Sequence, residues 1–345
     1  MISSLPVAAL AAAGLVAAST AAQAQSTLRI HGVLDASAGS FQDAGAARDR
    51  RIDSGTLTTS HLGVSGVEDL SGGLKVTFSI EHFLRLDQGE AGRYSGDAFW
   101  ARNAYVGLHG AFGKSLLGRN TTPLFAATTQ FNAFGESFGV SPAVRQIFAP
   151  AMLPYFGDRG WSNSLAYTSN NGDGLTLQLM ANLTEAAPGA TGRNAAAGAL
   201  YVSGPLAATA GLQLVRNGDG ISTGTLSAPA GFARQNTWQL GASYDLVVVK
   251  LFGLYTEVKT TAAANSKTKI WGWGTTMPLP GGKLLAQYGS ATARAAGGET
   301  VHRTLSLGYD HDLSKTTDLY AVWMTDKITG LSRGNTLAGG MRLRF

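Results

Sequence analysis

The stretch Leu337-Ala-Gly-Gly-Met-Arg-Leu-Arg-Phe345 decides the fold, because its side chains alternate between two chemically different faces. Alternate side chains of a β-strand point to opposite sides, so Leu343 and Phe345 share one face. Arg342 and Arg344 share the other face. In a soluble sheet the apolar face would need a covering layer, and an ordinary C-terminal strand of that kind is the alternative. In a lipid-embedded barrel the apolar face contacts hydrocarbon and the arginines face water in the lumen.

The same alternation of apolar and polar residues recurs along the chain. Each strand that the alternation predicts has about ten residues, the length that a tilted strand needs to cross the hydrocarbon of a membrane. The alternating runs lie at 28–35, 74–81, 238–244, 304–310 and 319–323.

The connections between the predicted strands alternate between tight turns and longer polar stretches. Outer-membrane barrels show this pattern, with short periplasmic turns and longer outer loops. Seven short and eight long connections predict sixteen strands, with both chain ends on the periplasmic side. The tight turns are predicted at 69–72, 110–113, 171–174, 203–205, around Asp245, 277–282 and 312–315. The longer stretches are predicted at 39–55, 85–97, 121–159, 185–194, 217–233, 259–266, 294–299 and 327–334.

Aromatic residues near the predicted strand ends suit the interfacial girdles of a membrane barrel. No segment after residue 24 approaches a continuous apolar run of 18 residues, so we expect no membrane-spanning helix. A large soluble β protein is the alternative, but its strands would be shorter or would repeat, and no repeat period is visible. The aromatic residues are Tyr105, Tyr201, Trp238, Tyr244, Tyr288, Tyr309, Trp323 and Phe345.

Residues 1–24 have the pattern of a secretory signal peptide. An apolar run from Leu5 to Ala18 precedes Ala22-Gln-Ala24, a small-x-small cleavage site. We therefore expect an exported protein with residues 25–345 as its transmembrane β-barrel domain. Cysteine is absent, which excludes disulfides and cysteine-based metal sites. The net charge of +5 includes no basic run of the kind that binds nucleic acid, so we expect no nucleic-acid partner.

Catalytic and cofactor motifs are not recognisable in the chain. The six histidines lie in no nucleophile motif, and His109 and His311 have no companion metal ligands at suitable spacing. Gly272-Trp-Gly274 is a strand fragment rather than a phosphate-binding loop. We expect no enzyme activity, no cofactor and no bound metal. An outer-membrane hydrolase and a plugged structural or adhesin barrel are the alternatives from other classes.

Several short motifs occur in order along the chain. They are His31-Gly-Val-Leu-Asp35, Leu62-Gly-Val-Ser-Gly-Val-Glu-Asp-Leu-Ser-Gly-Gly-Leu-Lys75, Arg102-Asn-Ala-Tyr-Val-Gly-Leu108, Phe112-Gly113, Leu117-Gly-Arg119, Asn163-Ser-Leu-Ala-Tyr167 and Phe345. Together they resemble the general diffusion porins of Gram-negative bacteria, most closely the β-proteobacterial branch. The resemblance implies an all-β, 16-stranded antiparallel barrel in the bacterial outer membrane, normally a homotrimer embedded in outer-membrane lipid. It also implies passive diffusion of small hydrophilic solutes and ions.

The longest predicted connection, 121–159, is rich in aromatic residues. In the porin family the third loop folds inward and narrows the pore, and Phe134-Gly-Glu-Ser-Phe-Gly139 matches the place of that loop's tip. The resemblance therefore implies an inward-folded third loop, with packing on a neighbouring subunit as the alternative. The aromatic residues of this connection are Phe125, Phe131, Phe134, Phe138, Phe148, Tyr155 and Phe156.

The resemblance also implies a constriction with arginines on the barrel wall facing carboxylates on the inward loop. Arg102 matches the family's wall arginine, Arg119 follows on the lumen side of the next strand, and His61 stands where the family usually has an arginine. For each arginine, a lumen position away from the constriction is the alternative. The predicted constriction residues are Arg102, Arg119, His61, Glu136, Lys75, Arg159, Asp158 and Arg145.

The predicted loop supplies few carboxylates to balance the basic residues of the lumen. Only Glu136 and Asp158 would face the cluster of Arg102, Arg119, Lys75, Arg342 and Arg344. We therefore expect a positive potential inside the pore and a modest preference for anions. A substrate-specific channel is the alternative, and its mark would be an aromatic track or paired charges along the lumen.

Overall fold

The computed structural model describes residues 26–149, 152–153, 155–183, 193–216 and 229–345. Within these residues the chain forms one antiparallel sheet of eighteen strand segments that closes on itself. One segment, β5, has only two residues, and β2 and β3 share one position beside β1, so the barrel has sixteen strands, as predicted. The expected signal peptide, residues 1–24, lies outside the described residues.

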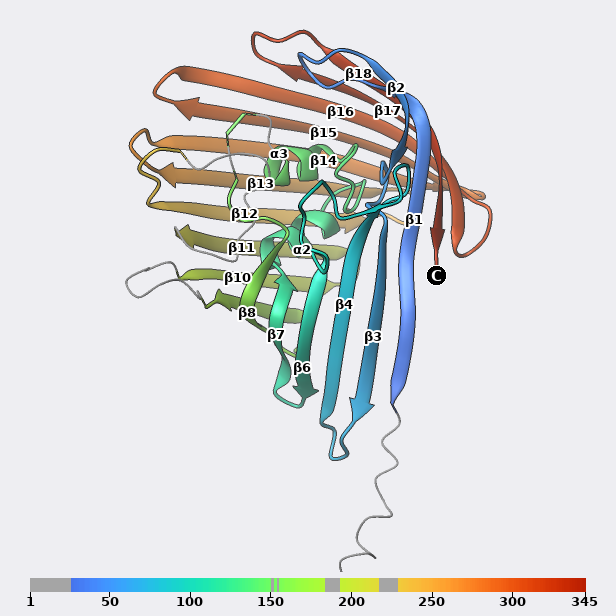
Figure 1. Cartoon of the computed structure of the whole chain (residues 1–345), viewed down its shortest axis with the longest axis vertical. Helices are drawn as coiled ribbons and strands as arrows, with labels where there is room; N and C mark the ends of the chain where they lie inside the picture. Colours follow the sequence, from blue (N-terminus) through green and yellow to red (C-terminus); the bar gives the residue numbers. More distant parts are fainter. Residues whose placement is uncertain (1–25, 150–151, 154, 184–192, 217–228) are drawn as a thin grey trace, which may run out of the picture.

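Figure 1 shows the strands in chain order around the barrel. They are β1 (Thr27–Phe41), β2 (Asp49–Ser54), β3 (His61–Asp69), β4 (Lys75–Arg85), β5 (Glu90–Ala91), β6 (Asn103–Gly110), β7 (Gly113–Thr121), β8 (Gly160–Thr168), β9 (Leu175–Asn182), β10 (Asn194–Ser203), β11 (Leu206–Arg216), β12 (Arg234–Asp245), β13 (Lys250–Thr261), β14 (Ser266–Leu279), β15 (Gly282–Ala295), β16 (Gly298–Asp312), β17 (Thr317–Ile328) and β18 (Gly334–Arg344).

The first and last strands close the barrel. β1 pairs with β18 along a ladder that starts at Val33 opposite Arg344. Beyond it, Gly32 and Phe345 exchange two backbone hydrogen bonds of 3.0 and 3.2 Å. A Cβ atom at Gly32 would lie 2.9 Å from the ring of Phe345, so glycine makes room for this aromatic ring.

Inward and outward faces follow the predicted alternation in the last strand. Met341 and Phe345 face outward and are 53% and 49% exposed, as membrane-facing side chains are without lipid. Arg342 faces inward and is only 8% exposed. The predicted division into an apolar outer face and a basic inner face is therefore present.

The short and long connections lie near the places that the alternation gave them, but several bounds differ. The predicted stretch 85–97 continues to residue 102, because β6 begins only at Asn103. The predicted outer stretch 39–55 contains β2, so only 42–48 forms the connection, because the strand resumes before the chain turns inward. The predicted stretches 259–266 and 294–299 shorten to 262–265 and 296–297, since β13 to β16 extend into them. Stretches 185–194 and 217–233 fall largely outside the described residues. Among the described residues, no helix is long and apolar enough to cross a membrane.

The chain turns inward between β2 and β3. Gly55 has a φ of 78°, a left-handed conformation that glycine adopts readily, and the strand stops there. The carboxylate of Asp35 on β1 then accepts backbone hydrogen bonds from Leu57 and Thr58 at 3.2 and 2.7 Å. These bonds hold the segment from Gly55 to Ser60 on the inner side of the barrel.

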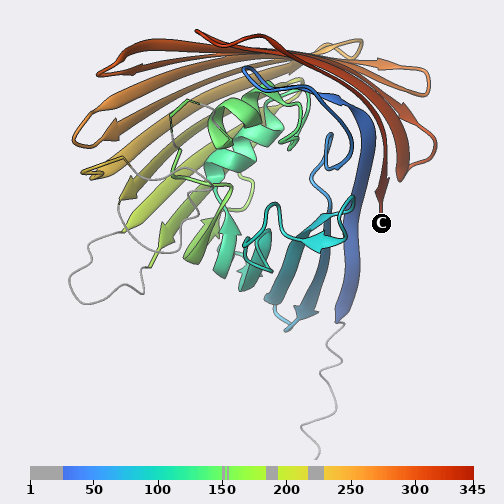
Figure 2. The same ribbon diagram turned by 45° about the horizontal axis from the view of Figure 1, so that its top comes forward.

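The third loop carries two short helices, α2 (Pro123–Gln130) and α3 (Pro142–Phe148), which lie inside the ring of strands (Figure 2). Both begin with a hydroxyl cap followed by proline, a combination that suits a helix start. Thr122 accepts a hydrogen bond from the backbone N–H of Phe125, and Ser141 accepts one from Val144. The predicted inward-folded third loop is therefore confirmed.

Small residues on the inner wall make room for the loop's aromatic rings. Cβ atoms at Gly241 and Gly308 would each lie 3.1 Å from a ring carbon, of Phe131 and Phe134 respectively. Near the loop tip, Ser137 donates a 2.7 Å hydrogen bond to the backbone carbonyl of Thr56 in the inward segment. The loop is thus packed on β12, β16 and the inward segment, rather than on a neighbouring molecule.

Candidate functional site

The tip of the third loop meets the barrel wall through an ion pair. Arg102, directly before β6, places Nη1 3.1 Å from Oε2 of Glu136 at the loop tip. Its Nε lies 3.0 Å from Oε2 of Glu81, which faces inward from β4. Glu81 also accepts hydrogen bonds from Ser79 and Asn103, both of 2.9 Å. Arg102 therefore links a wall carboxylate held in a fixed orientation to the loop carboxylate.

A second group of charges lies where the third loop rejoins the barrel. Arg93, in the connection 86–102, places Nη1 3.0 Å from Oδ1 of Asp158 and Nε 2.9 Å from Oδ2 of Asp97. Arg119, which faces inward from β7, places Nη2 3.4 Å from Oδ2 of Asp158. Asp158 has a φ of 38°, in the left-handed region that aspartate tolerates better than most residues. Two arginines from different elements thus share this one carboxylate.

The pKa values in this group show how strongly the ion pairs act. Burial disfavours the charge of Arg93, but the charge of Asp158 and the hydrogen bonds to Asp97 raise the pKa of Arg93. Burial also disfavours the charge of Asp97, yet the hydrogen bonds and charge of Arg93 lower the pKa of Asp97 below its usual 3.8. Both side chains are therefore ionised at neutral pH.

Three arginines surround one buried aromatic ring. The guanidinium carbons of Arg93, Arg102 and Arg159 lie 5.3, 5.9 and 5.2 Å from the ring centre of Phe83. At these distances the ring face attracts the cations. Phe83 is 1% exposed, so this attraction acts in a poorly solvated place.

Arg159 differs from its neighbours in its partners. It is 2% exposed and donates hydrogen bonds to the backbone carbonyl of Arg102 and to Oγ1 of Thr121. Within the described part of the chain it forms no ion pair with a carboxylate. Burial and the nearby charge of Arg102 lower the pKa of Arg159, but a guanidinium titrates so far above neutrality that it stays charged. Arg159 therefore adds a positive charge that no direct partner neutralises.

Six of the eight predicted constriction residues lie near one another. Arg102, Glu136, Arg119, Asp158 and Arg159 make the contacts described above. The sixth, His61, is 5% exposed on β3, opposite Phe83 in the strand ladder.

The other two predicted residues lie elsewhere. Lys75 pairs with Asp69 at 3.6 Å beside the short turn between β3 and β4, about 20 Å along the strand from Glu81. Arg145 on α3 pairs with Asp43 at 2.6 Å, which ties the helix to the connection between β1 and β2. A role at the constriction stays a prediction for all eight.

Sequence reasoning missed Glu81, Phe83, Arg93 and Asp97. The alternation in 74–81 already puts Glu81 on the inner face, but carboxylates were sought only in the third loop. Arg93 and Asp97 lie in an irregular connection, where no period indicates which way a side chain points. Only the folded position of this connection reveals that Arg93 contacts Asp158 as well as Asp97.

A separate charge network lies beside the barrel seam. Arg342 on β18 places Nε 3.1 Å from Oδ1 of Asp318 and Nη2 2.8 Å from Oδ2 of Asp310. Arg344 reaches Asp318 as well, at 2.5 Å. The basic inner face of the last strand is therefore balanced by carboxylates of β16 and β17.

Comparison with known proteins gives consistent matches over nearly the whole chain. A family model described as Gram-negative porin matches residues 8–330. Outer membrane porin protein 32 of Delftia acidovorans is 30% identical, over 96% of this chain and 94% of the relative. A solved anion-selective porin from Comamonas acidovorans has a TM-score of 0.77 at 25% identity, covering 93% of this chain and all of that one. The trimer form of OmpT from Vibrio cholerae is alike in fold alone, with a TM-score of 0.67 at 15% identity, covering 93% of this chain and 99% of that one.

Proposed function

This chain belongs to the Gram-negative porin family, and on that basis we propose that its outer-membrane pore has a modest preference for anions. The pore itself serves the passive diffusion of small hydrophilic solutes and ions. Passive diffusion requires positioned charges and an open path but no bond-making group, so the absence of enzyme activity is part of the proposal.

One observation carries the anion preference: Glu136 is the only carboxylate from 121 to 157, and Arg102 engages it. The inward loop therefore offers permeating cations no free carboxylate. The wall carboxylates Glu81 and Asp158 are also bound to arginines, which makes the expected preference modest rather than strong. The anion-selective porin at 25% identity supports the same direction.

The experiment is conductance of the purified, folded protein in a planar bilayer with a potassium chloride gradient. A reversal potential that leans toward chloride supports the proposal, and a clear cation preference contradicts it. Conductance that saturates with one class of solute would favour a substrate-specific channel instead. An absence of conductance from correctly folded barrel would reopen the plugged-barrel alternative.

We also propose that residues 1–24 are a signal peptide that is removed. The mature chain, residues 25–345, then forms a homotrimer. The family resemblance supports this assembly, as does the trimer form of a protein with the same fold. Conductance steps in groups of three and a trimer mass in mild detergent are expected. Amino-terminal sequencing of protein purified from outer membranes tests the cleavage site before Gln25.

A further inference from the structure

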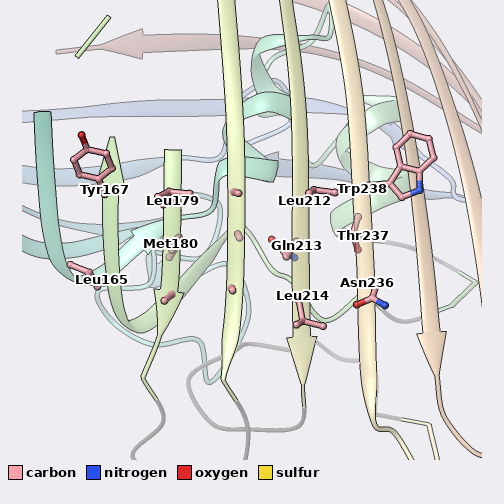
Figure 3. A pocket seen from close by; sticks show the side chains of 14 residues that line it. Leu165, Tyr167, Leu179, Met180, Leu212, Gln213, Leu214, Asn236, Thr237 and Trp238 are labelled. Carbon is pink, nitrogen blue, oxygen red and sulfur yellow. The ribbon is translucent and has the colours of Figure 1, made fainter. Parts of the chain in front are cut away.

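The hollows on the outer and inner faces of the barrel wall differ in chemistry. An apolar groove of about 660 Å³ runs along the outer wall of β8 to β12 (Figure 3). Leu179 and Leu212 flank it and are 55% and 64% exposed, and no charged side chain of the described residues lines it. Membrane hydrocarbon covers an outer surface of this kind, so a water-soluble ligand would not bind there. A charged pocket on the inner wall is open to such ligands.

This inner pocket has a volume of about 150 Å³ and lies where β1, β2, β17 and β18 meet the third loop. Its floor is apolar, with Phe41 of β1 and Met324 of β17, which are 9% and 1% exposed. The adjoining connection 42–48 is one of the longer connections, and outer-membrane barrels turn these to the outside of the cell. The pocket therefore belongs to the outer mouth of the barrel, on the side from which solutes enter.

Charged groups of both signs line the pocket. Asp49, Arg51 and Asp53 alternate along β2 and share its inner face, since Asp49 is the ladder partner of the inward-facing Phe41. Arg51 places Nη1 3.0 Å from Oδ2 of Asp49 and Nε 3.2 Å from Oδ1 of Asp53. Arg145 of α3 lines the same pocket from the third loop. The pocket thus offers guanidinium and carboxylate groups side by side.

The guanidinium of Arg51 is held in one orientation yet keeps hydrogens for a ligand. Its carbon lies 4.3 Å from the centre of the Phe41 ring, whose face attracts the cation. The two aspartates engage one hydrogen on each of its three nitrogens, and Nη1 and Nη2 each carry a second hydrogen. A side chain that is fixed before binding loses less conformational entropy when a ligand arrives. Arg51 is therefore prepared to bind an anionic group.

The other charged groups of the pocket are also positioned. Nη1 of Arg145 donates a 3.1 Å hydrogen bond to the backbone carbonyl of Gly139, which fixes this guanidinium beside the loop. The side chain of Asp49 is 59% exposed and uses Oδ2 for Arg51. Its Oδ1 has no hydrogen-bond partner within the part of the chain that the structure describes. Asp49 can therefore accept a hydrogen bond from a cationic group of a ligand.

The volume of the pocket limits the size of its ligand. Drug-sized ligands occupy pockets of about 300 Å³ or more, which excludes them here. A cavity of about 150 Å³ admits benzene, so roughly six non-hydrogen atoms fill such a space. Alanine has this number of atoms and carries a carboxylate, an ammonium and a methyl group on one carbon. The methyl group suits the apolar floor of Phe41 and Met324.

We propose that this pocket binds small zwitterions of the α-amino acid class at the entrance of the pore. The ligand carboxylate accepts charge-assisted hydrogen bonds from Arg51 and Arg145, and the ligand ammonium donates one to Asp49. A simple anion would face the carboxylates of β2, and a simple cation would face the two guanidinium groups. Like charges placed together are costly, so a molecule with both charges fits best. The site does not depend on the ion preference of the pore.

Ligand-observed NMR titration of the purified, folded protein tests the proposal with alanine, propionate and ethylamine. Propionate lacks the ammonium of alanine, and ethylamine lacks its carboxylate. We expect alanine to bind about tenfold more tightly than either one, because each of them loses a charge-assisted hydrogen bond. Equal affinity for propionate would show an anion site, and equal affinity for ethylamine a cation site. Either result, or the absence of saturable alanine binding, would overturn the proposal.

Variants of β2 assign the two charges of the ligand to their partners. Arg51→Gln should weaken alanine binding about tenfold and strengthen ethylamine binding, because the aspartates beside it lose their cation. Asp49→Asn should weaken the binding of alanine and ethylamine but not of propionate. Arg50→Gln changes the neighbouring arginine on the outer face of the same strand and is the matched control. Equal alanine affinity in the Arg51→Gln and Arg50→Gln variants would overturn the assignment, and heat-dependent gel migration verifies that each variant is folded.

Discussion

Glu136 and Arg102 join the loop inside the barrel to the wall around it, with 3.1 Å between Oε2 and Nη1. The two residues are 34 positions apart, and the pair connects the tip of one connection to the end of another. Because the carboxylate of Glu136 and the guanidinium of Arg102 neutralise each other, a substitution of either residue should alter the electrostatic potential in the lumen and the position of the third loop.

Replacement of Glu136 by Gln should shift the reversal potential further toward chloride. The change removes the loop carboxylate and leaves the charge of Arg102 less balanced. A unit charge 4 Å from an ion in water is worth about 1 kcal/mol, so we expect a change of about two- to fivefold in permeability ratio. Asp43→Asn, which removes the partner of Arg145 on the same loop, is the control. An unchanged ratio would place Glu136 away from the ion path.

Replacement of Arg102 by Gln should have the opposite effect. Glu81 and Glu136 then lose their shared cation, and the preference should fall or turn toward cations by a similar factor. Arg102→Lys keeps the charge and should preserve the sign of the preference. Lys75→Gln, at the distant turn, should leave selectivity unchanged. An equal effect of the Arg102→Gln and Lys75→Gln variants would contradict the grouping of site residues given by the structure.

The contact between Asp97 and Arg93 should persist during mild acidification. The pKa of Asp97 is lowered below 3.8 in the folded protein. A lowered carboxyl pKa means that the pair's contribution to stability is complete above the unfolded pKa and is lost as pH falls through the folded value. Channel noise should therefore stay constant from pH 7 to about 4 and rise below that range. Asp97→Asn should be noisy at every pH, and a noise increase already near pH 6 would show that another group controls the loop.

Asp318→Ala should destabilise the barrel near its seam. Asp318 is fully buried and accepts hydrogen bonds from Arg342 and Arg344, so its removal leaves buried positive charge unpaired. Breaking such a pair costs about 3–5 kcal/mol. Asp87→Ala removes an exposed aspartate from the connection 86–102, away from this network, and is the control. Urea unfolding followed by tryptophan fluorescence measures the difference, and equal midpoints for both variants would argue against the network.

The barrel could be predicted from the sequence because its whole outer surface faces the same medium, the hydrocarbon of the membrane. Lipid requires an apolar side chain at every second position of a strand, and runs such as 74–81 and 337–345 record that requirement directly. No alternation in the sequence indicates that the chain turns inward at Gly55. The turn depends on the Asp35 carboxylate, which binds the backbone of Leu57 and Thr58 from a strand about twenty residues earlier.

The charge cluster was predictable only in part, for a related reason. Arg102 and Arg119 follow from the family resemblance rather than from the alternation. Arg102 precedes β6, and Arg119 has the parity of the outward-facing Leu117 but turns inward after a bulge at Gly118. Arg93 and Asp97 lie in an irregular connection, where alternation indicates no direction. The contact of Arg93 with Asp158 depends on how two irregular connections pack together. Sequence therefore indicates which strand residues face the lumen, but not which loop residues join them.

The pairing of β1 with β18 has a consequence for the order of events during folding. Gly32 and Phe345 are bonded across 313 residues, nearly the greatest separation that the chain allows. Contacts between residues so far apart in the sequence form late, because closing the long chain between them costs conformational entropy. Until the last strand arrives, both the first strand and the growing end expose unpaired backbone edges, which are prone to associate with other chains. Closure is thus a single terminal step, and interference with that step leaves an open sheet rather than a smaller pore.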